Sequence, residues 1–350
     1  MFETKNLYKY GIILGVVIIA SYFSDKVRSA FDTKDRDEYE MVKKYLLNDS
    51  PLYGYNRPKL WIHTKYDINA RKWRDFYSRN TTDLNQPYIH LTIKSIINHC
   101  SDYFHICLID DESFSKLLPT WDLDMNLTPD PMRSQYRQLG LAQLVYYYGG
   151  LVVPNSFLCT RNLKDMYERG TMGGKPFVCE AINRTSNLNT QTNGSNLLFI
   201  PSTYFLGAKK NDIVILEYIE YLKDRSKRGY YTNEYEFVGD TETGAWGTIS
   251  TGKMNLIKGE FIGIKTNKGR QVLLEDILED NYLDLNPNIY GIYIPEDEIL
   301  SRPKFQWFAV LNSEQILETN TFLARQFKAS IVDTYYSNEK IGEIKSTIAI

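Results

Sequence analysis

Residues Arg133 to Thr160 read RSQYRQLGLAQLVYYYGGLVVPNSFLCT, and this stretch decides the fold that we predict. Its first half shows the three- and four-residue spacing of apolar side chains that is typical of a helix: Leu139, Ala142, Val145 and Tyr146. Gly149-Gly150 ends the helix, because glycine adopts the left-handed cap conformation without a steric penalty. Leu151-Val152-Val153 then predicts a short buried strand, and Pro154 ends it because proline has no N–H to donate.

Strand-like and helical patterns alternate on both sides of this stretch. Strands are predicted at Lys59–His63, Phe104–Ile109 and Pro176–Ile182, and helices at Pro87–Asn98, Ser113–Leu118 and Asp212–Lys223. One long amphipathic helix is predicted within Leu311–Thr334. Helices placed between buried strands predict an α/β fold, in which ligands bind at the carboxyl ends of the strands.

A helix, then Tyr-Gly-Gly, then an apolar strand resembles the glycosyltransferases of the DXD sugar-binding type, most closely the capsular-polysaccharide-synthesis group. The second-best match is residues 86–119, QPYIHLTIKSIINHCSDYFHICLIDDESFSKLLP. The resemblance covers about residues 57–252. It implies a GT-A-like nucleotide-sugar-binding core with a mixed sheet, acting on a nucleotide sugar and a glycan acceptor.

The chain departs from this family at the residues best known for chemistry. After Tyr-Gly-Gly the family places apolar residues and then Asp-X-Asp, whose carboxylates hold a divalent metal on the sugar-nucleotide pyrophosphate. Here those positions hold Pro154, Asn155 and Ser156. The family's Ser-Asp and Arg in the preceding helix correspond to Arg137, Gln138 and Leu141. We therefore predict no metal ligands there, and expect Mn²⁺ or Mg²⁺ only if Asp110 and Asp111 replace the missing carboxylates.

The predicted nucleotide-sugar site consists of residues at strand ends and on the helix: Trp61, His63, Asp110, Asp111, Arg137, Gln138, Asn155 and Ser156. Trp61 and His63 share one face of their strand, where they flank a base or sugar, or are a core tryptophan and a hydrogen-bonded histidine. Asp110 and Asp111 bind a ribose or a metal, or cap the helix that follows them. Both pairs of alternatives stay open.

Arg137 lies one helical turn before the place where the family keeps its arginine, so its long side chain reaches the same pocket and grips a phosphate. Asp240 and Glu242 precede Thr243–Thr248, which resembles the family's Thr-Gly-Pro step. These two carboxylates are the candidate catalytic bases, and a plain exposed loop is the alternative.

The N-terminus contains an uncharged apolar run, Gly11–Phe23. It is shorter than the about 20 residues that usually span a bilayer, but Tyr and Lys residues flank it and suit the interfaces. We expect residues 10–24 to form a single-pass membrane anchor, with a cleaved signal peptide as the alternative. The side of the membrane stays open, because flanking charges favour a cytosolic body whereas the family resemblance favours the lumen.

Composition narrows the function classes. A net charge of −2 over 350 residues gives no basic field for nucleic acid. The four cysteines form no C-x-x-C pair, which argues against a zinc or redox motif and favours buried free thiols; a disulfide stays open for a lumenal domain. The 27 tyrosines, with many Asn, Lys and Ile, suit an AT-rich genome such as that of a large DNA virus.

We therefore predict a membrane anchor at residues 1–28, a stem at 29–56, a glycosyltransferase-like domain at 57–310 and a C-terminal helical segment at 311–350. The predicted function is that of a membrane-anchored glycosyltransferase-like protein, with weak or lost activity if nothing replaces the missing carboxylates. One alternative is a non-catalytic component of a membrane or viral particle, with a protein partner at the C-terminal helix. Another is a lectin-like binder without turnover.

Overall fold

A computed structural model describes residues 57–64, 86–119, 121–129, 132–180, 201–228, 244–245 and 247–331 of this chain. The predicted anchor at residues 10–24, the stem at 29–56 and the candidate bases Asp240 and Glu242 lie outside these ranges. Within them, every helix is too short or too polar to cross a bilayer.

Six strands form one mixed sheet in the order β2-β1-β3-β6-β5-β7, and two more form a separate ladder, β4-β8. The strands are β1 Lys59–His63, β2 His105–Ile109, β3 Gly150–Val152, β4 Phe157–Cys159, β5 Phe177–Glu180, β6 Pro201–Ala208, β7 Asn255–Ile257 and β8 Gly291–Tyr293. The β1/β2, β1/β3 and β5/β7 pairs are parallel, whereas β6 runs antiparallel to β3 and β5. The predicted α/β class with a mixed sheet is therefore confirmed.

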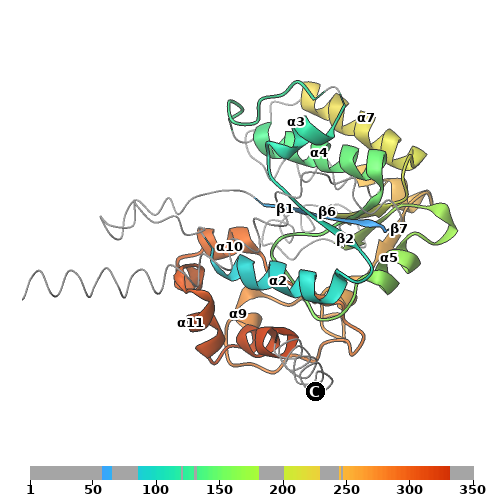
Figure 1. The fold of residues 1–350 in the computed structure, drawn as a ribbon. Helices are drawn as coiled ribbons and strands as arrows, with labels where there is room; N and C mark the ends of the chain where they lie inside the picture. The colour runs from blue at the N-terminus through green and yellow to red at the C-terminus, as the bar shows by residue number, and fades with distance from the viewer. Residues whose placement is uncertain are drawn as a thin grey trace, which may run out of the picture. The chain divides into compact units, whose positions relative to one another are not determined.

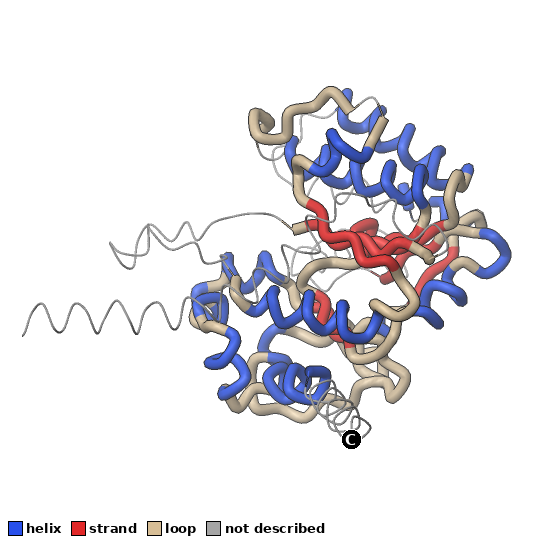
Figure 2. The backbone as a smooth tube through the Cα atoms, viewed as in Figure 1, coloured by secondary structure: helices blue, strands red, loops and turns tan. Residues whose placement is uncertain are grey.

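Helices cover both faces of this sheet (Figure 1). They are α2 Tyr88–Cys100, α3 Ser113–Leu117, α4 Met132–Tyr148, α5 Lys164–Gly170, α7 Ile213–Arg228, α9 Leu274–Ile277, α10 Glu296–Ser301 and α11 Ser313–Glu318, with 3-10 turns at Met172–Gly174, Gly259–Phe261, Pro303–Phe305 and Phe308–Val310. Helices α3, α4 and α7 lie on one side of the strands and α2 on the other, so the strands form a central layer (Figure 2).

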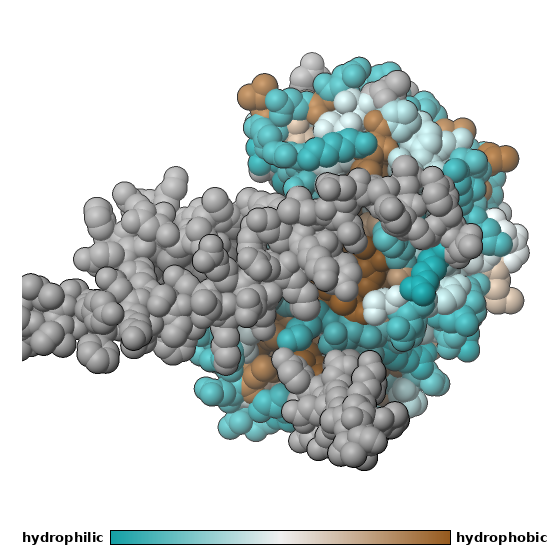
Figure 3. Space-filling view, in the orientation of Figure 1, coloured by the Kyte–Doolittle hydropathy of each residue, from teal (hydrophilic) through white to brown (hydrophobic). Residues whose placement is uncertain are grey.

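Two apolar clusters account for this arrangement. The first joins the sheet to α3, α4 and α7, and includes Trp61, Phe114, Leu144, Val145, Val152, Ile215 and Leu222. The second joins α2, β4 and β8 to the helices of the C-terminal third, and includes Tyr88, Leu158, Ile292, Phe305, Phe308, Ile316, Leu323 and Phe327. Outside these clusters, polar residues form most of the surface seen in Figure 3, with hydrophobic residues in patches between them.

The Tyr-Gly-Gly turn connects the end of α4 to β3 in the sheet. Gly149 and Gly150 have φ of 70° and 106°, a region that residues with a Cβ rarely adopt. Gly150 also lies directly against the backbone of Lys59 on β1, where a Cβ would overlap the Lys59 carbonyl oxygen. The two glycines therefore let β3 turn sharply out of α4 and pair in parallel with β1.

The prediction of a single long helix near the C-terminus is wrong. The structure has α11 at Ser313–Glu318 and a second helix over residues 322–331, with a break at 319–321. The Thr321 hydroxyl accepts a hydrogen bond from the Ala324 N–H at 3.1 Å, as a residue that begins a helix does. Both helices bury their apolar sides in the second cluster of the same protein chain.

The four cysteines are free and buried, as predicted from the sequence. Cys100 and Cys159 lie with their sulfur atoms 3.8 Å apart, between α2 and β4. Burial raises the pKa of the Cys159 thiol, and the neighbouring Cys100 adds to this effect. A buried thiol with a raised pKa is a poor nucleophile, so Cys159 belongs to the core rather than to the chemistry of a site.

Candidate functional site

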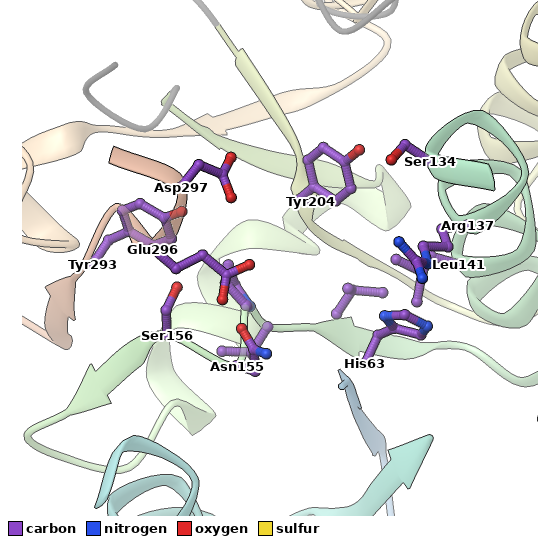
Figure 4. Close-up of a pocket in the computed structure, with 13 residues that line it drawn as sticks. His63, Ser134, Arg137, Leu141, Asn155, Ser156, Tyr204, Tyr293, Glu296 and Asp297 are labelled. Carbon is purple, nitrogen blue, oxygen red and sulfur yellow. The ribbon is translucent and has the colours of Figure 1, made fainter. Parts of the chain in front are cut away.

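A pocket opens where β1 and β3 end, in the position that an open α/β sheet gives its ligands. Its cavity volume is about 70 Å³, room for several water molecules or part of a small ligand. The residues that line it come from β1, α4, the β3–β4 connection, β6, the end of β8 and α10: His63, Ser134, Arg137, Leu141, Val152, Val153, Pro154, Asn155, Ser156, Tyr204, Tyr293, Glu296 and Asp297. Figure 4 shows these side chains around the cavity.

One side of the pocket is built on a buried ion pair. The Arg137 guanidinium on α4 donates two hydrogen bonds to Asp111, from Nε at 2.8 Å and from a terminal nitrogen at 2.6 Å. The His63 ring lies 2.9 Å from Asp111 Oδ1 through Nε2, and stacks on Phe114 with 5.5 Å between ring centroids. Asp111 therefore fixes two side chains that line the pocket, although it is not itself part of the wall.

The charge of Asp111 is set by these partners. Burial by itself raises the pKa of the Asp111 carboxyl, but the hydrogen bonds and charges of Arg137 and His63 outweigh burial and hold the pKa well below its usual range. A carboxylate that stays ionised beside a guanidinium also keeps that guanidinium in one orientation, because the pair is bidentate. The result is a fixed wall, in which Asp111 holds the Arg137 guanidinium in one orientation with the His63 ring beside it.

The floor of the pocket is the segment that follows β3. Asn155 is held by its backbone, since its carbonyl accepts a hydrogen bond from the Thr92 hydroxyl at 2.5 Å. The Ser156 carbonyl accepts one from the Ile294 N–H at 3.0 Å. Their side chains line the cavity, and Figure 4 shows both directed into it. The structure therefore brings four of the predicted binding residues, His63, Arg137, Asn155 and Ser156, to one pocket.

The opposite wall is acidic, and sequence reasoning missed it. Tyr293, at the end of β8, is followed by Glu296 and Asp297 in the first turn of α10. All three line the cavity, and Figure 4 shows Glu296 beside Asn155 and Ser156, across the pocket from Arg137 and His63. The sequence offered one clue, the cluster Pro295-Glu-Asp-Glu298, but nothing local links it to residues 154–156.

Trp61 does not belong to the pocket, which corrects the prediction that its ring flanks a base or sugar. Its side chain is fully buried, and its indole N–H donates to the Gly149 carbonyl at 3.0 Å. Tyr148 packs beside it, with 5.8 Å between ring centroids. Trp61 is thus the core tryptophan of the alternative interpretation, and it holds β1 against the Tyr-Gly-Gly turn.

Asp110 and Gln138 also lie away from the wall of the pocket. Asp110 Oδ1 accepts hydrogen bonds from the Ser113 N–H at 2.9 Å and from its hydroxyl at 2.7 Å, so this aspartate caps the start of α3. The Gln138 amide donates to the Thr203 hydroxyl and to the Tyr218 hydroxyl, and it ties α4 to β6 and α7. Asp110 thus takes the helix-capping alternative, and Gln138 joins structural elements instead of lining the cavity.

The hypothesis that Asp110 and Asp111 hold a metal does not fit this geometry. Asp110 caps a helix, and both oxygens of Asp111 accept hydrogen bonds from Arg137. A guanidinium within hydrogen-bonding distance opposes a cation at the same carboxylate. Within the ranges that the structure describes, there is also no group of three or more His, Cys, Asp or Glu side chains that would form a metal cage by itself.

Comparison with known proteins adds little detail. No family model matches the chain, and no curated protein matches it. Among solved structures, the chain is similar to one described as PaToxG Glycosyltransferase, with 11% sequence identity over 55% of this chain and 70% of that one, and a TM-score of 0.35. The fold and the pocket themselves define a mixed α/β protein with a small-ligand pocket at the carboxyl ends of parallel strands.

Proposed function

We propose that this protein is glycosyltransferase-like and that its pocket binds a nucleotide sugar. The observation that carries the proposal is the convergence of His63, Arg137, Asn155 and Ser156 on one pocket at the ends of β1 and β3. The sequence resemblance to sugar transferases of the DXD type predicts a nucleotide-sugar site at this position. The proposal concerns the chemistry of the pocket, where charged and hydrogen-bonding groups surround the apolar side chains of Leu141, Val152 and Val153.

The diphosphate of the ligand would lie at the wall that Arg137 and Ser134 form. Arg137 is the best phosphate ligand there, because a guanidinium held by a carboxylate is already oriented before the anion arrives. Ser134 lines the same wall from the first turn of α4, a helix of 17 residues whose N-terminal end carries positive charge. A phosphate beside Ser134 and Arg137 would meet a hydroxyl, a guanidinium and the helix end together.

Binding of a nucleotide sugar does not by itself imply that the sugar is transferred. Asparagine and serine offer oxygen atoms without negative charge, so residues 154–156 hold a hard cation far less well than Asp-X-Asp would. We propose that transfer is weak or lost unless another group neutralises the leaving diphosphate. A non-catalytic role that uses the same pocket for binding is the second candidate, and the missing carboxylates at Pro154–Ser156 favour it.

A panel of nucleotide sugars tests the binding proposal. We expect at least one donor to raise the melting temperature of the full chain, because a ligand that binds only the folded state stabilises it. Arg137→Lys keeps the charge but loses the bidentate geometry, so affinity should fall by about tenfold or more. Arg270→Lys, at the Arg270–Asp276 pair outside the pocket, should leave affinity unchanged.

If Arg137→Lys does not fold, Ser134→Ala is the second variant for the same affinity measurement, since it removes only one hydroxyl from the pocket wall. An absence of any shift across uridine, guanosine, adenosine and cytidine donors, with and without Mn²⁺, would rule out the proposed ligand class. Equal affinity of wild type and both pocket variants would place the ligand elsewhere on the protein.

Membrane anchoring by residues 10–24 is part of the proposal. The apolar run Gly11–Phe23 carries it, together with the flanking tyrosines and lysines. We expect the full chain to stay in the membrane fraction after carbonate extraction, and a chain without residues 1–28 to be released. A full chain found in the soluble fraction would contradict the anchor.

A further inference from the structure

We propose that Glu296 and Asp297, with Asn155 and Ser156, hold a divalent cation of the Mg²⁺ or Mn²⁺ class in this pocket once a nucleoside diphosphate is bound. This inference rests on the proposed function. It assigns to α10, in the C-terminal third of the chain, the charge that Pro154–Ser156 do not supply.

The first step is the strand pairing that brings α10 to this place. Strands β4 and β8 are antiparallel, with Phe157 opposite Tyr293. The hydrogen bond from the Ile294 N–H to the Ser156 carbonyl continues the ladder by one residue. One residue later, after Pro295, the chain enters α10 at Glu296, so the first turn of α10 directly follows this ladder. The end of β3 carries no carboxylates of its own, and α10 instead supplies Glu296 and Asp297 to the same pocket.

The second step concerns two buried polar side chains that point into the acidic part of the pocket. Asn155 is 8% exposed and Ser156 1% exposed. Their backbone carbonyls accept the bonds from Thr92 and Ile294. Among the residues that the structure describes, none makes a hydrogen bond with the Asn155 amide group or the Ser156 hydroxyl. Both side chains therefore offer oxygen atoms to a ligand in the pocket.

Helix geometry alone does not explain the acidic wall. Acidic residues are favourable in the first turn of a helix, and α10 has three there: Glu296, Asp297 and Glu298. Glu298 forms an ion pair with Arg302 within the helix, at 3.4 Å. Glu296 and Asp297 line the cavity, where Figure 4 shows them with Tyr293 and Ser156.

The third step is electrostatic. A diphosphate bound at Arg137 would share this pocket with two carboxylates, and like charges repel. A divalent cation between them turns this repulsion into attraction. Mg²⁺ in particular is usually held by one or two protein carboxylates together with substrate phosphates, rather than by a protein cage. Two carboxylates and two neutral oxygen ligands match that pattern, so the cation and the diphosphate should bind together.

The test measures Mn²⁺ and diphosphate binding to the full chain, with free Mn²⁺ followed by its electron paramagnetic resonance signal. We expect weak binding of Mn²⁺ alone. A nucleoside diphosphate chosen from UDP, GDP, ADP and CDP should strengthen it, and Mn²⁺ should strengthen diphosphate binding by the same factor, about 5- to 150-fold. In the double variant Glu296→Gln/Asp297→Asn this mutual enhancement should disappear, while the diphosphate still binds without metal.

Glu298→Gln is the matched control, because it removes a carboxylate from the same helical turn but not from the pocket. It should keep the full enhancement. Diphosphate binding that is equally strong with and without Mn²⁺, or enhancement that survives in the double variant, would overturn the cation site and leave the proposed function intact. Binding of no diphosphate and no nucleotide sugar under either condition would overturn both.

Discussion

Gly150→Ala is expected to destabilise the protein by about 3 kcal/mol or more, because a strained backbone and an overlapping Cβ act at one position. Gly150 has a φ of 106°, and its added Cβ would overlap the Lys59 carbonyl oxygen on β1. Neither atom is at the end of a flexible side chain, so relief requires β1 and β3 to separate. For a chain of this size, the melting temperature should fall by about 5 °C.

Gly174→Ala separates the two causes. Gly174 also has positive φ, 71°, but a Cβ there meets no atom within 4 Å. Its cost should be the conformational one alone, about 1–2 kcal/mol. Thermal and urea unfolding of the two variants measure the difference. If Gly150→Ala were as stable as Gly174→Ala, β3 would not lie against β1 as described.

Asp111→Ala is expected to destabilise the protein by about 3 kcal/mol, the lower end of the usual cost of removing one partner of a buried ion pair, because Asp111 is only partly buried. The side chains of Arg137 and Asp111 are 9% and 18% exposed, so solvent replaces the lost carboxylate poorly. His63 loses the same partner. Glu217→Ala is the control, because its pair with Lys253 is half exposed and should contribute at most about 1 kcal/mol.

The same carboxylate predicts a dependence of stability on pH. Since folding lowers the pKa of Asp111, the folded state favours its ionised form. This contribution is therefore fully present above the unfolded pKa of about 3.9, and is lost as the pH falls from there toward the lowered folded pKa. The difference in unfolding free energy between wild type and Asp111→Asn should shrink below about pH 4. A constant difference from pH 7 to pH 3 would contradict the ionised pair.

Local sequence patterns predicted most of the elements that position the pocket. The helix before Tyr-Gly-Gly and the strands β1, β2 and β3 are short-range features, set by periodicity, glycine and proline. The prediction of one long C-terminal helix failed for a physical reason. Apolar spacing continues through residues 313–331, but Thr321 offers the chain a cap that competes with helical hydrogen bonds.

The pocket was only half predictable. His63 is the last residue of one strand that local patterns reveal and Asn155 follows another, so their place at strand ends could be expected. The alternation of side chains along β1 predicted which face of the strand carries Trp61. It could not predict that the Gly149 carbonyl accepts a hydrogen bond from the Trp61 indole N–H. Glu296 was out of reach, because it joins the pocket through the pairing of β4 with β8, and no local pattern specifies which distant strands meet.

The β4–β8 ladder has a consequence for trimming the protein. The family resemblance ends near residue 252, yet Tyr293, Glu296 and Asp297 complete the pocket from beyond that point. A shortened chain that stopped at the end of the resemblance would lose one side of the cavity and would uncover the apolar edge of β4 at Phe157 and Leu158. A minimal fragment for expression should therefore extend at least through Ile331, the last residue of the described helix that packs in the second cluster.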